Sequence, residues 1–202
     1  PRQAFLERVR QAVAQGNRAG AAPSLPERGD VGYQGGGDDL AQTFCQELAS
    51  AGGHAHLANS DEDARAILQR ILHDIPGRKV LLTHAGATAR LGLADRLRGL
   101  GFEVDAFAPG QTPPRETVFA ADVGITPAYR LIAETGTIVA ATGEGDARSV
   151  SLLPPVHVCI ADRAQLLPDL FDLFALFAPQ TSSTPAAPPA CLTLITGPSK
   201  TG

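Results

Sequence analysis

The sequence predicts an α/β protein whose parallel sheet is covered by helices. Residues 79–83 (KVLLT) form an almost continuous apolar run, which is typical of a strand that is buried on both faces. Strand, helix, strand, helix and strand are expected in that order at 54–58, 61–75, 79–83, 89–98 and 102–108. This order with short connections is the pattern of strand–helix–strand units in a parallel sheet.

The chain begins with an amphipathic segment that is followed by a change of composition. One helical stripe of residues 3–15 is apolar and consists of Phe5, Leu6, Val9 and Val13. Residues 16–37 are rich in glycine, proline and alanine, which indicates a flexible linker. We therefore expect an N-terminal helical arm with its linker at 1–37, which docks on the domain or on a partner, and one α/β domain at 38–202.

Two helices near the start of the domain have clear signals for their ends. Large apolar residues recur every four positions from Leu40 to Leu48, and Gly52 follows, which predicts a helix that ends there. Ser60 precedes three acidic residues, a pattern typical of an N-cap whose helix dipole is balanced by negative charge. The helix that begins there is expected to end at Pro76 and Gly77.

The second half of the chain alternates in the same way but with shorter elements. We expect a loop at 109–115, a strand at 123–125, a short helix at 127–134, a strand at 137–141, a polar loop at 142–151, a strand at 156–161, an apolar helix at 163–177, a low-complexity segment at 181–190 and a last strand at 191–196. His157, inside an apolar strand, is expected to be a core residue.

Composition and charge exclude several classes of protein. The net charge is −4, with 17 basic and 21 acidic residues, and no run of Lys or Arg exceeds two, so nucleic-acid binding is not expected. The three cysteines include no C-x-x-C pair, so we expect no metal or iron–sulfur ligands, no cofactor held by this chain, and a reducing, cytoplasmic location. No segment approaches the ~18 apolar residues of a membrane span.

The loops that follow the strands are the candidate ligand site. In open α/β sheets, ligands bind in the crevice beyond the carboxyl ends of the strands. These loops are rich in Gly, Thr and Ser, and Arg148 and Lys200 add two cations that suit a carboxylate or a phosphate. The predicted ligand-binding residues are Thr126, Thr135, Gly136, Thr137, Arg148, Ser149, Gly197, Ser199, Lys200 and Thr201.

Several other patterns in the sequence give weaker predictions of function. Glu134 is expected at the end of the short helix, where the dipole disfavours a carboxylate, so it is the candidate catalytic residue. The loop before Lys200 lacks the glycine that a Walker A loop requires, and the Gly-rich loop at 142–149 lacks the third glycine of a dinucleotide fingerprint. His54 and His56 share one face of a predicted strand but have no partner ligand. His84, directly after a strand, is a better site candidate.

The stretch from Asp122 to Asp162, together with ITGPSKTG at the end, resembles the LUD-domain family. The residues that carry the resemblance are Gly124 to Thr126, Ala133 to Thr137, Ser149 to Pro154 with His157, and Gly197 to Thr201. The resemblance implies a three-layer α/β/α sandwich with a mostly parallel sheet, similar to the NagB/RpiA/CoA-transferase type. It also implies a role in oxidising L-lactate to pyruvate, beside partner subunits that carry iron–sulfur clusters.

Three functions remain open. The first is an accessory or substrate-handling subunit for lactate oxidation that binds a small carboxylate or phosphate. The second is a stand-alone enzyme on the same fold, such as a CoA-transferase, a sugar-phosphate isomerase or a folate cyclo-ligase, with Glu134 as nucleophile or base. The third is a scaffold without chemistry that joins partners through its N-terminal helix and its apolar 163–177 segment.

Overall fold

The computed structural model describes residues 2–16, 35–142, 148–177 and 189–199. Contacts divide the chain into two compact units, Pro1–Gly32 and Tyr33–Gly202. The first contains α1 (Arg2–Gly16), a helix as the sequence predicts, whose apolar stripe is exposed along its length. Most of the predicted linker and of the low-complexity segment lies outside the described residues, so their flexibility stays a prediction. Gly36, assigned to the arm by sequence, accepts a 2.7 Å hydrogen bond from Thr43 in the second unit.

A parallel sheet organises the second unit, as predicted. Its strands are β1 (Lys79–Thr83), β2 (Glu103–Phe107), β3 (Val123–Pro127) and β6 (Val156–Ile160), and within the described residues their order is β2-β1-β3-β6. All three pairings are parallel, so the carboxyl ends of the four strands meet at one edge. The carboxylate of Asp122 accepts the backbone N–H groups of Arg78 and Lys79 at 2.8 and 2.9 Å, which ties the start of β1 to the start of β3.

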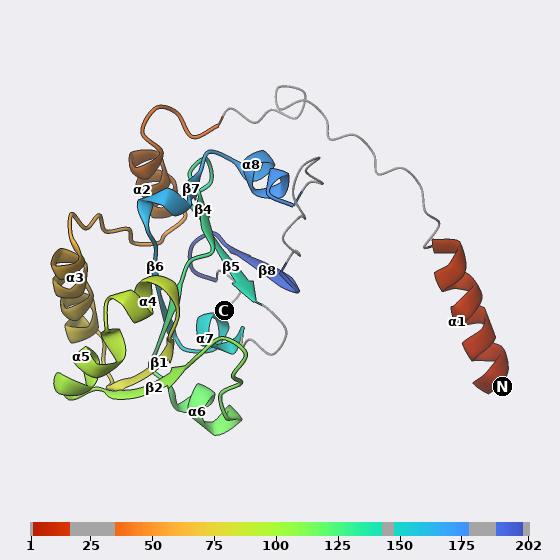
Figure 1. Ribbon diagram of the computed structural model, residues 1–202, viewed down its shortest axis with the longest axis horizontal. Helices are drawn as coiled ribbons and strands as arrows, with labels where there is room; N and C mark the ends of the chain where they lie inside the picture. Colours follow the sequence, from red (N-terminus) through yellow and green to blue (C-terminus); the bar gives the residue numbers. More distant parts are fainter. Residues whose placement is uncertain (1, 17–34, 143–147, 178–188, 200–202) are drawn as a thin grey trace. The chain divides into compact units, whose positions relative to one another are not determined.

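Side chains of this sheet alternate between two covered faces, which makes the fold layered. Val80 and Leu82 of β1 face a helical layer built from α3 (Asp61–Asp74), α4 (Gly86–Arg90) and α5 (Leu93–Gly99). Leu81 faces the other way, toward α6 (Arg115–Ala120) and α7 (Ser149–Leu152). Figure 1 shows these two groups of helices on opposite sides of β1 and β2. Val80, Leu81 and Leu82 are each 2% exposed or less. Burial on both faces of the sheet therefore explains the continuous apolar run.

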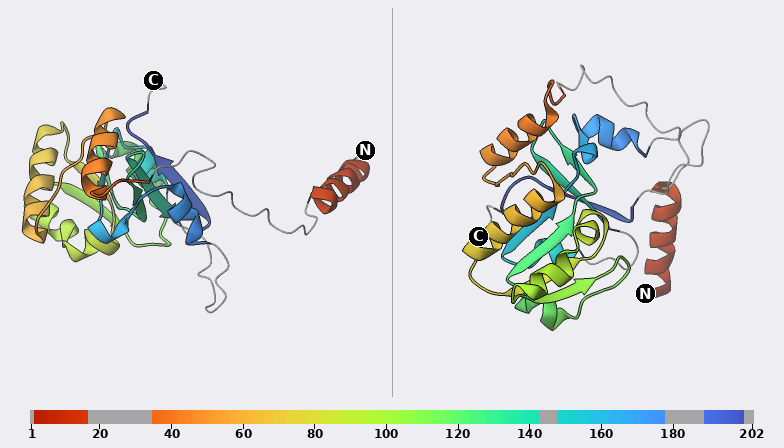
Figure 2. Two further views of the ribbon diagram at one scale, coloured as in Figure 1. Left: turned by 90° about the horizontal axis from the view of Figure 1, so that it is seen from above. Right: turned by 60° about the vertical axis from the view of Figure 1, so that its left-hand side comes forward.

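A second, mixed sheet extends the domain. It contains β4 (Arg130–Ile132), β5 (Thr137–Thr142), β7 (Leu166–Leu167) and β8 (Cys191–Ile195), in the order β7-β4-β5-β8. One face packs on α8 (Leu170–Ala175). The other packs on α2 (Leu40–Ser50) together with Cys159 and Ala161 at the end of β6. Seen from above, the yellow α3 and the dark blue β8 lie on opposite sides of the domain (Figure 2, left).

The structure corrects four elements that the sequence assigned differently. Residues 54–58 form no strand, so the two histidines there share no strand face. Residues 130–132 are the strand β4 rather than part of a helix, because they pair with β5 and with the distant β7. Residues 163–177 divide into a 3₁₀ turn, β7 and α8, because the leucines at 166 and 167 join the second sheet. The helix α7 lies mostly within the loop that was expected at 142–151, and α6 follows the expected loop at 109–115, where the sequence predicted no element.

No helix in the described part of the chain has the length and apolarity needed to cross a membrane.

Candidate functional site

A cavity of about 140 Å³ lies at the carboxyl edge of the parallel sheet. It is well below the roughly 300–1,000 Å³ of sites for drug-sized ligands, so it suits only a small molecule. Its walls come from the ends of β1, β2, β3 and β5, from the loop after β2, and from α7. The polar residues that line it are Thr83, Gln111, Thr126, Thr142, Arg148 and Ser151. Arg148 is the cation among the lining residues, and no acidic side chain belongs to this set.

Gly124 is the reason that α7 reaches this edge. A Cβ atom at position 124 would lie 1.9 Å from the carbonyl oxygen of Val150, so only glycine allows the helix backbone to rest on the strand. Arg148 precedes α7 and Ser151 lies within it, and both therefore reach the cavity. The Arg148 side chain is exposed, and its Nη1 lies 3.6 Å from Sγ of Cys191 at the start of β8. The resulting environment is a hydroxyl-rich hollow with one cation at its rim.

Thr126 forms part of a polar cluster beneath the cavity. Its Oγ1 lies 2.9 Å from Nε2 of His157, and the two residues come from the paired strands β3 and β6. Burial lowers the pKa of His157 to about 4, so the imidazole is neutral at physiological pH. Burial also raises the pKa of Cys159 to about 12, against a smaller lowering by its hydrogen bond with Thr126, so this thiol stays protonated. The cluster therefore carries no net charge.

Four of the other predicted ligand residues gather at the opposite end of β5: Thr135, Gly136, Thr137 and Gly197. Thr137 begins this strand and Thr142 ends it, which separates the two groups by roughly 17 Å at ~3.4 Å per residue. Oγ1 of Thr137 lies 2.6 Å from Oγ1 of both Thr135 and Thr196. The hairpin turn and the end of β8 are thus joined by hydroxyl groups, and this contact lies away from the cavity.

Two glycines of this second group have a packing role. A Cβ at Gly136 would lie 2.2 Å from the backbone nitrogen of Leu48, and one at Gly197 would lie 2.5 Å from the carbonyl oxygen of Ala51. Both have a positive φ, 60° and 73°, which disfavours other residues. The end of α2 therefore sits directly against both loops, and their glycines are explained without a ligand.

Glu134 does not lie at the end of a helix, so the dipole argument for it is wrong. It is in the hairpin turn between β4 and β5, and its backbone N–H donates to the carbonyl of Pro168 at 3.0 Å. Its side chain is half-buried, with Oε2 shielded from solvent, and it does not line the cavity beside Arg148. Nothing in this placement brings the carboxylate to Arg148.

Four further candidates complete the predicted set. Lys200 and Thr201 lie outside the described residues, so their expected role stays a prediction. Ser199 is exposed, close to the end of the described chain. Ser149 begins α7 and its carbonyl accepts the N–H of Leu153, while the neighbouring Arg148 and Ser151 are the residues that line the cavity.

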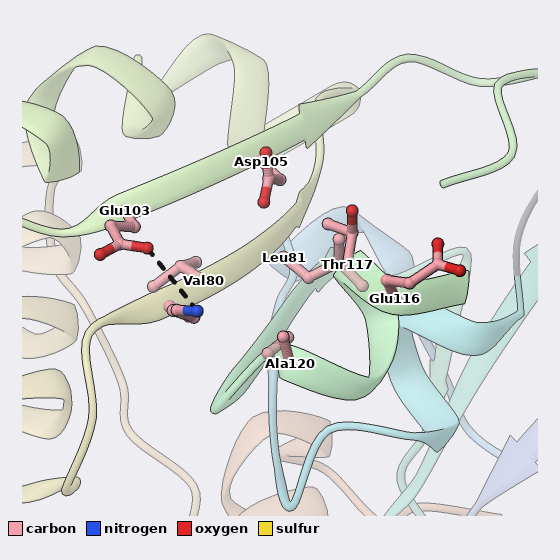
Figure 3. Close-up of a pocket in the computed structure, with 9 residues that line it drawn as sticks. Val80, Leu81, Glu103, Asp105, Glu116, Thr117 and Ala120 are labelled. Carbon is pink, nitrogen blue, oxygen red and sulfur yellow. Dashed lines mark ion pairs between the residues drawn. The ribbon is translucent and has the colours of Figure 1, made fainter. Parts of the chain in front are cut away.

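A larger cavity, of about 260 Å³, lies elsewhere, between β1, β2 and α6 (Figure 3). Three carboxylates line it, from Glu103, Asp105 and Glu116, and its one cation, Lys79, faces Glu103 at 4.0 Å. This charge repels a carboxylate or phosphate ligand. We therefore place the anion site in the smaller cavity, where the lining charge is positive.

Sequence reasoning missed His157 as a site residue and four hydroxyl or amide groups that line the cavity, those of Thr83, Gln111, Thr142 and Ser151. The apolar neighbours of His157 pointed to the core, and the imidazole is indeed largely buried, but it also contacts Thr126. The parallel pairing of β3 with β6 places Thr126 and His157 on neighbouring strands, and this pairing is the signal that could have identified the contact. Among the described residues, no group of three or more His, Cys, Asp and Glu is arranged to hold a metal ion.

The fold and this edge define an α/β/α protein with a small polar cavity at the carboxyl ends of a parallel sheet. A crystal structure of a DUF162-family protein from Deinococcus radiodurans has a similar fold, with a TM-score of 0.50 at 20% identity over 66% of this chain and 74% of that chain. The LUD-domain family model matches residues 41–202. The chain therefore belongs to the LUD-domain family.

Two relatives have names that describe a process. Lactate utilization protein C of Halalkalibacterium halodurans is 26% identical over 202 residues, which cover 98% of this chain and 86% of that protein. Lactate utilization protein B of Macrococcus caseolyticus is 24% identical over 181 residues, which cover 65% of this chain but 38% of that protein. The family resemblance in the sequence and the fold expected from it are both confirmed.

Proposed function

We propose that this protein binds a small carboxylate in the cavity beside Arg148, as a substrate-handling subunit in the oxidation of L-lactate. The observation that carries the proposal is the joint position of Arg148 and the hydroxyls of Thr83, Thr126 and Ser151 around one small hollow. A guanidinium pairs well with a carboxylate, and hydroxyls satisfy its remaining lone pairs. The names of the two relatives support lactate as the ligand.

The binding step is tested by titrating the full chain with L-lactate in a calorimeter. Arg148→Ala is expected to weaken binding by about 10- to 100-fold, the equivalent of ~1.5–3 kcal/mol for a charge-assisted hydrogen bond. Arg70→Ala is the matched control, because Arg70 is an exposed arginine on α3, which covers the other face of the parallel sheet. Equal affinities of the two variants would reject Arg148 as the carboxylate ligand.

The role in the cell is tested separately by deleting the gene. Loss of growth on L-lactate, restored by the wild-type chain but not by Arg148→Ala, is the expected result. Unchanged growth of the deletion strain would contradict a function in lactate oxidation.

We further propose that the partner in this process is a cytoplasmic iron–sulfur protein, since this chain offers no cysteine cluster of its own. The exposed apolar stripe of α1 is the element suited to such a partner, because amphipathic helices bind by burying one face. Replacing Phe5 and Val9 by serine is expected to abolish co-purification with the co-expressed partner while leaving the domain folded. Retention of the partner by this variant would exclude α1 as its binding element.

The alternative of a stand-alone transferase or isomerase requires Glu134 at a substrate. Its half-buried position in a turn, away from the cavity of Arg148, gives that alternative no support. Turnover of CoA esters or phosphosugars by the purified chain, abolished by Glu134→Gln, would restore it.

A further inference from the structure

We propose that Thr126, positioned by His157, recognises the substituent on carbon 2 of a carboxylate held by Arg148, so that the cavity selects acids with a hydroxyl or oxo group there. The inference rests on the proposed function, since it assumes a carboxylate in this cavity. It specifies the chemical class of the ligand. Short 2-hydroxy and 2-oxo acids are expected to bind more tightly than unsubstituted acids of the same length.

The position of Thr126 supports this role. It is the next-to-last residue of β3, it lines the cavity, and it is 6% exposed, so a ligand that meets its hydroxyl is largely removed from water. A buried hydroxyl that faces a methylene group gains nothing, whereas one that faces an oxygen gains a hydrogen bond. Sites built in this way discriminate against ligands that lack the matching polar group.

His157 limits how the Thr126 hydroxyl points. The 2.9 Å contact between Oγ1 and Nε2, together with the hydrogen bond to the Cys159 thiol, uses two of the three hydrogen-bonding directions of the hydroxyl. A threonine hydroxyl has one proton and two lone pairs, so capacity for a bond to the ligand remains. Because the imidazole and the thiol of Cys159 are both neutral, the cluster offers hydrogen bonding without charge, which suits a hydroxyl or a carbonyl oxygen.

The two recognition groups are carried by segments of main chain that pack against each other. Arg148 directly precedes α7, and α7 rests on Gly124, two residues before Thr126 on the same strand. The groups proposed to bind the carboxylate and its neighbouring oxygen thus lie on two segments whose main chains are in contact. A fixed relation between these main chains favours the recognition of two adjacent functional groups of one ligand.

The test measures binding of L-lactate, pyruvate and propionate to the full chain by calorimetry, with folding checked by thermal unfolding. The wild-type chain is expected to bind lactate or pyruvate about tenfold more tightly than propionate. Thr126→Val is expected to remove this preference by weakening lactate and pyruvate about tenfold more than propionate, and Thr126→Ser, which keeps the hydroxyl, is expected to retain it. A preference that survives Thr126→Val, or three equal affinities in the wild type, overturns the inference but not the proposed function.

If none of the three acids binds, both the inference and the proposed function are overturned.

The positioning role of His157 is tested by the same ratio of affinities. His157→Leu is expected to lose the preference and His157→Gln, which keeps a polar nitrogen, to regain part of it. If His157→Leu does not fold, the comparison of Thr126→Val with Thr126→Ser decides the inference alone; a folded His157→Leu with an unchanged ratio excludes His157.

Discussion

The two ends of strand β5 look alike in sequence and differ in what surrounds them. At one end Thr142 faces a cavity with Arg148, and at the other Thr137 lies in a chain of hydroxyls under α2. Both regions are rich in Gly, Thr and Ser. The glycine turn at the Thr137 end is filled by a helix backbone, so its composition reflects close packing rather than a ligand. Loop composition alone therefore does not distinguish a site from a tight contact between main chains.

The largest effect is expected from adding a methyl group at the packed end. Gly136→Ala meets both a positive φ and the backbone of Leu48, and it is expected to lower the free energy of unfolding by about 2–5 kcal/mol. Gly92→Ala is the matched control, because Gly92 has almost the same φ, 61°, and no atom within 4 Å of the added methyl group. It is expected to cost only about 1 kcal/mol. Urea titration measures both values, and similar costs would show that the contact with α2 does not matter.

A smaller effect concerns the cavity end and its pH dependence. In the folded chain the pKa of His157 is about 4, below the 6.5 of an exposed histidine, because burial penalises the charged imidazole. The unfolded state then binds more protons between these values. Stability from this group is complete above pH 6.5 and is lost as the pH falls toward 4, by up to about 3 kcal/mol. Cys159 stays protonated throughout and contributes no slope.

The measurement for His157 is the difference between two pH profiles. Urea midpoints of the wild-type chain and of His157→Gln are compared from pH 7.5 to 4, so that the carboxylates common to both cancel. The wild-type chain is expected to lose more stability over this interval. Parallel profiles would place the imidazole in contact with water and remove it from the neutral cluster.

The smallest effect is expected from the hydroxyl chain. Thr137→Val removes two hydrogen bonds at a buried position and is expected to lower stability by about 1–2 kcal/mol. Lactate affinity should not change, because the site is at the other end of β5. A large loss of lactate binding in a folded Thr137→Val variant would contradict the division between the two regions.

The parallel sheet was the part of the fold that the sequence predicted best. Residues 79–83 form β1 with the expected bounds, because a run buried on both faces leaves little ambiguity. The second sheet was predicted poorly. Its strands β4 and β7 have three and two residues, and their pairing depends on segments more than thirty residues apart, which local periodicity does not contain.

The candidate site was predicted in part for a similar reason. The rule that ligands bind beyond the carboxyl ends of parallel strands located Thr126 and Arg148 in one cavity. The same rule grouped them with Gly136 and Gly197, since nothing in the sequence says that β5 and β8 run antiparallel and carry those loops to the other end. His157 was assigned to the core because a buried core residue and a buried residue that contacts a site both have apolar neighbours in the sequence.

The bare backbone at Gly124 has a consequence for how sites of this kind vary. The distance between α7 and the sheet is set by direct contact of two main chains. Substitutions of the α7 side chains that line the cavity therefore change its chemistry but not its depth. A single methyl group at position 124 would instead need more than an ångström of extra room, from 1.9 Å to an ordinary contact of at least 3.4 Å. Gly124 thus sets the distance between α7 and the sheet. A larger residue at this position would move α7 away from β3 and open the bottom of the cavity to water.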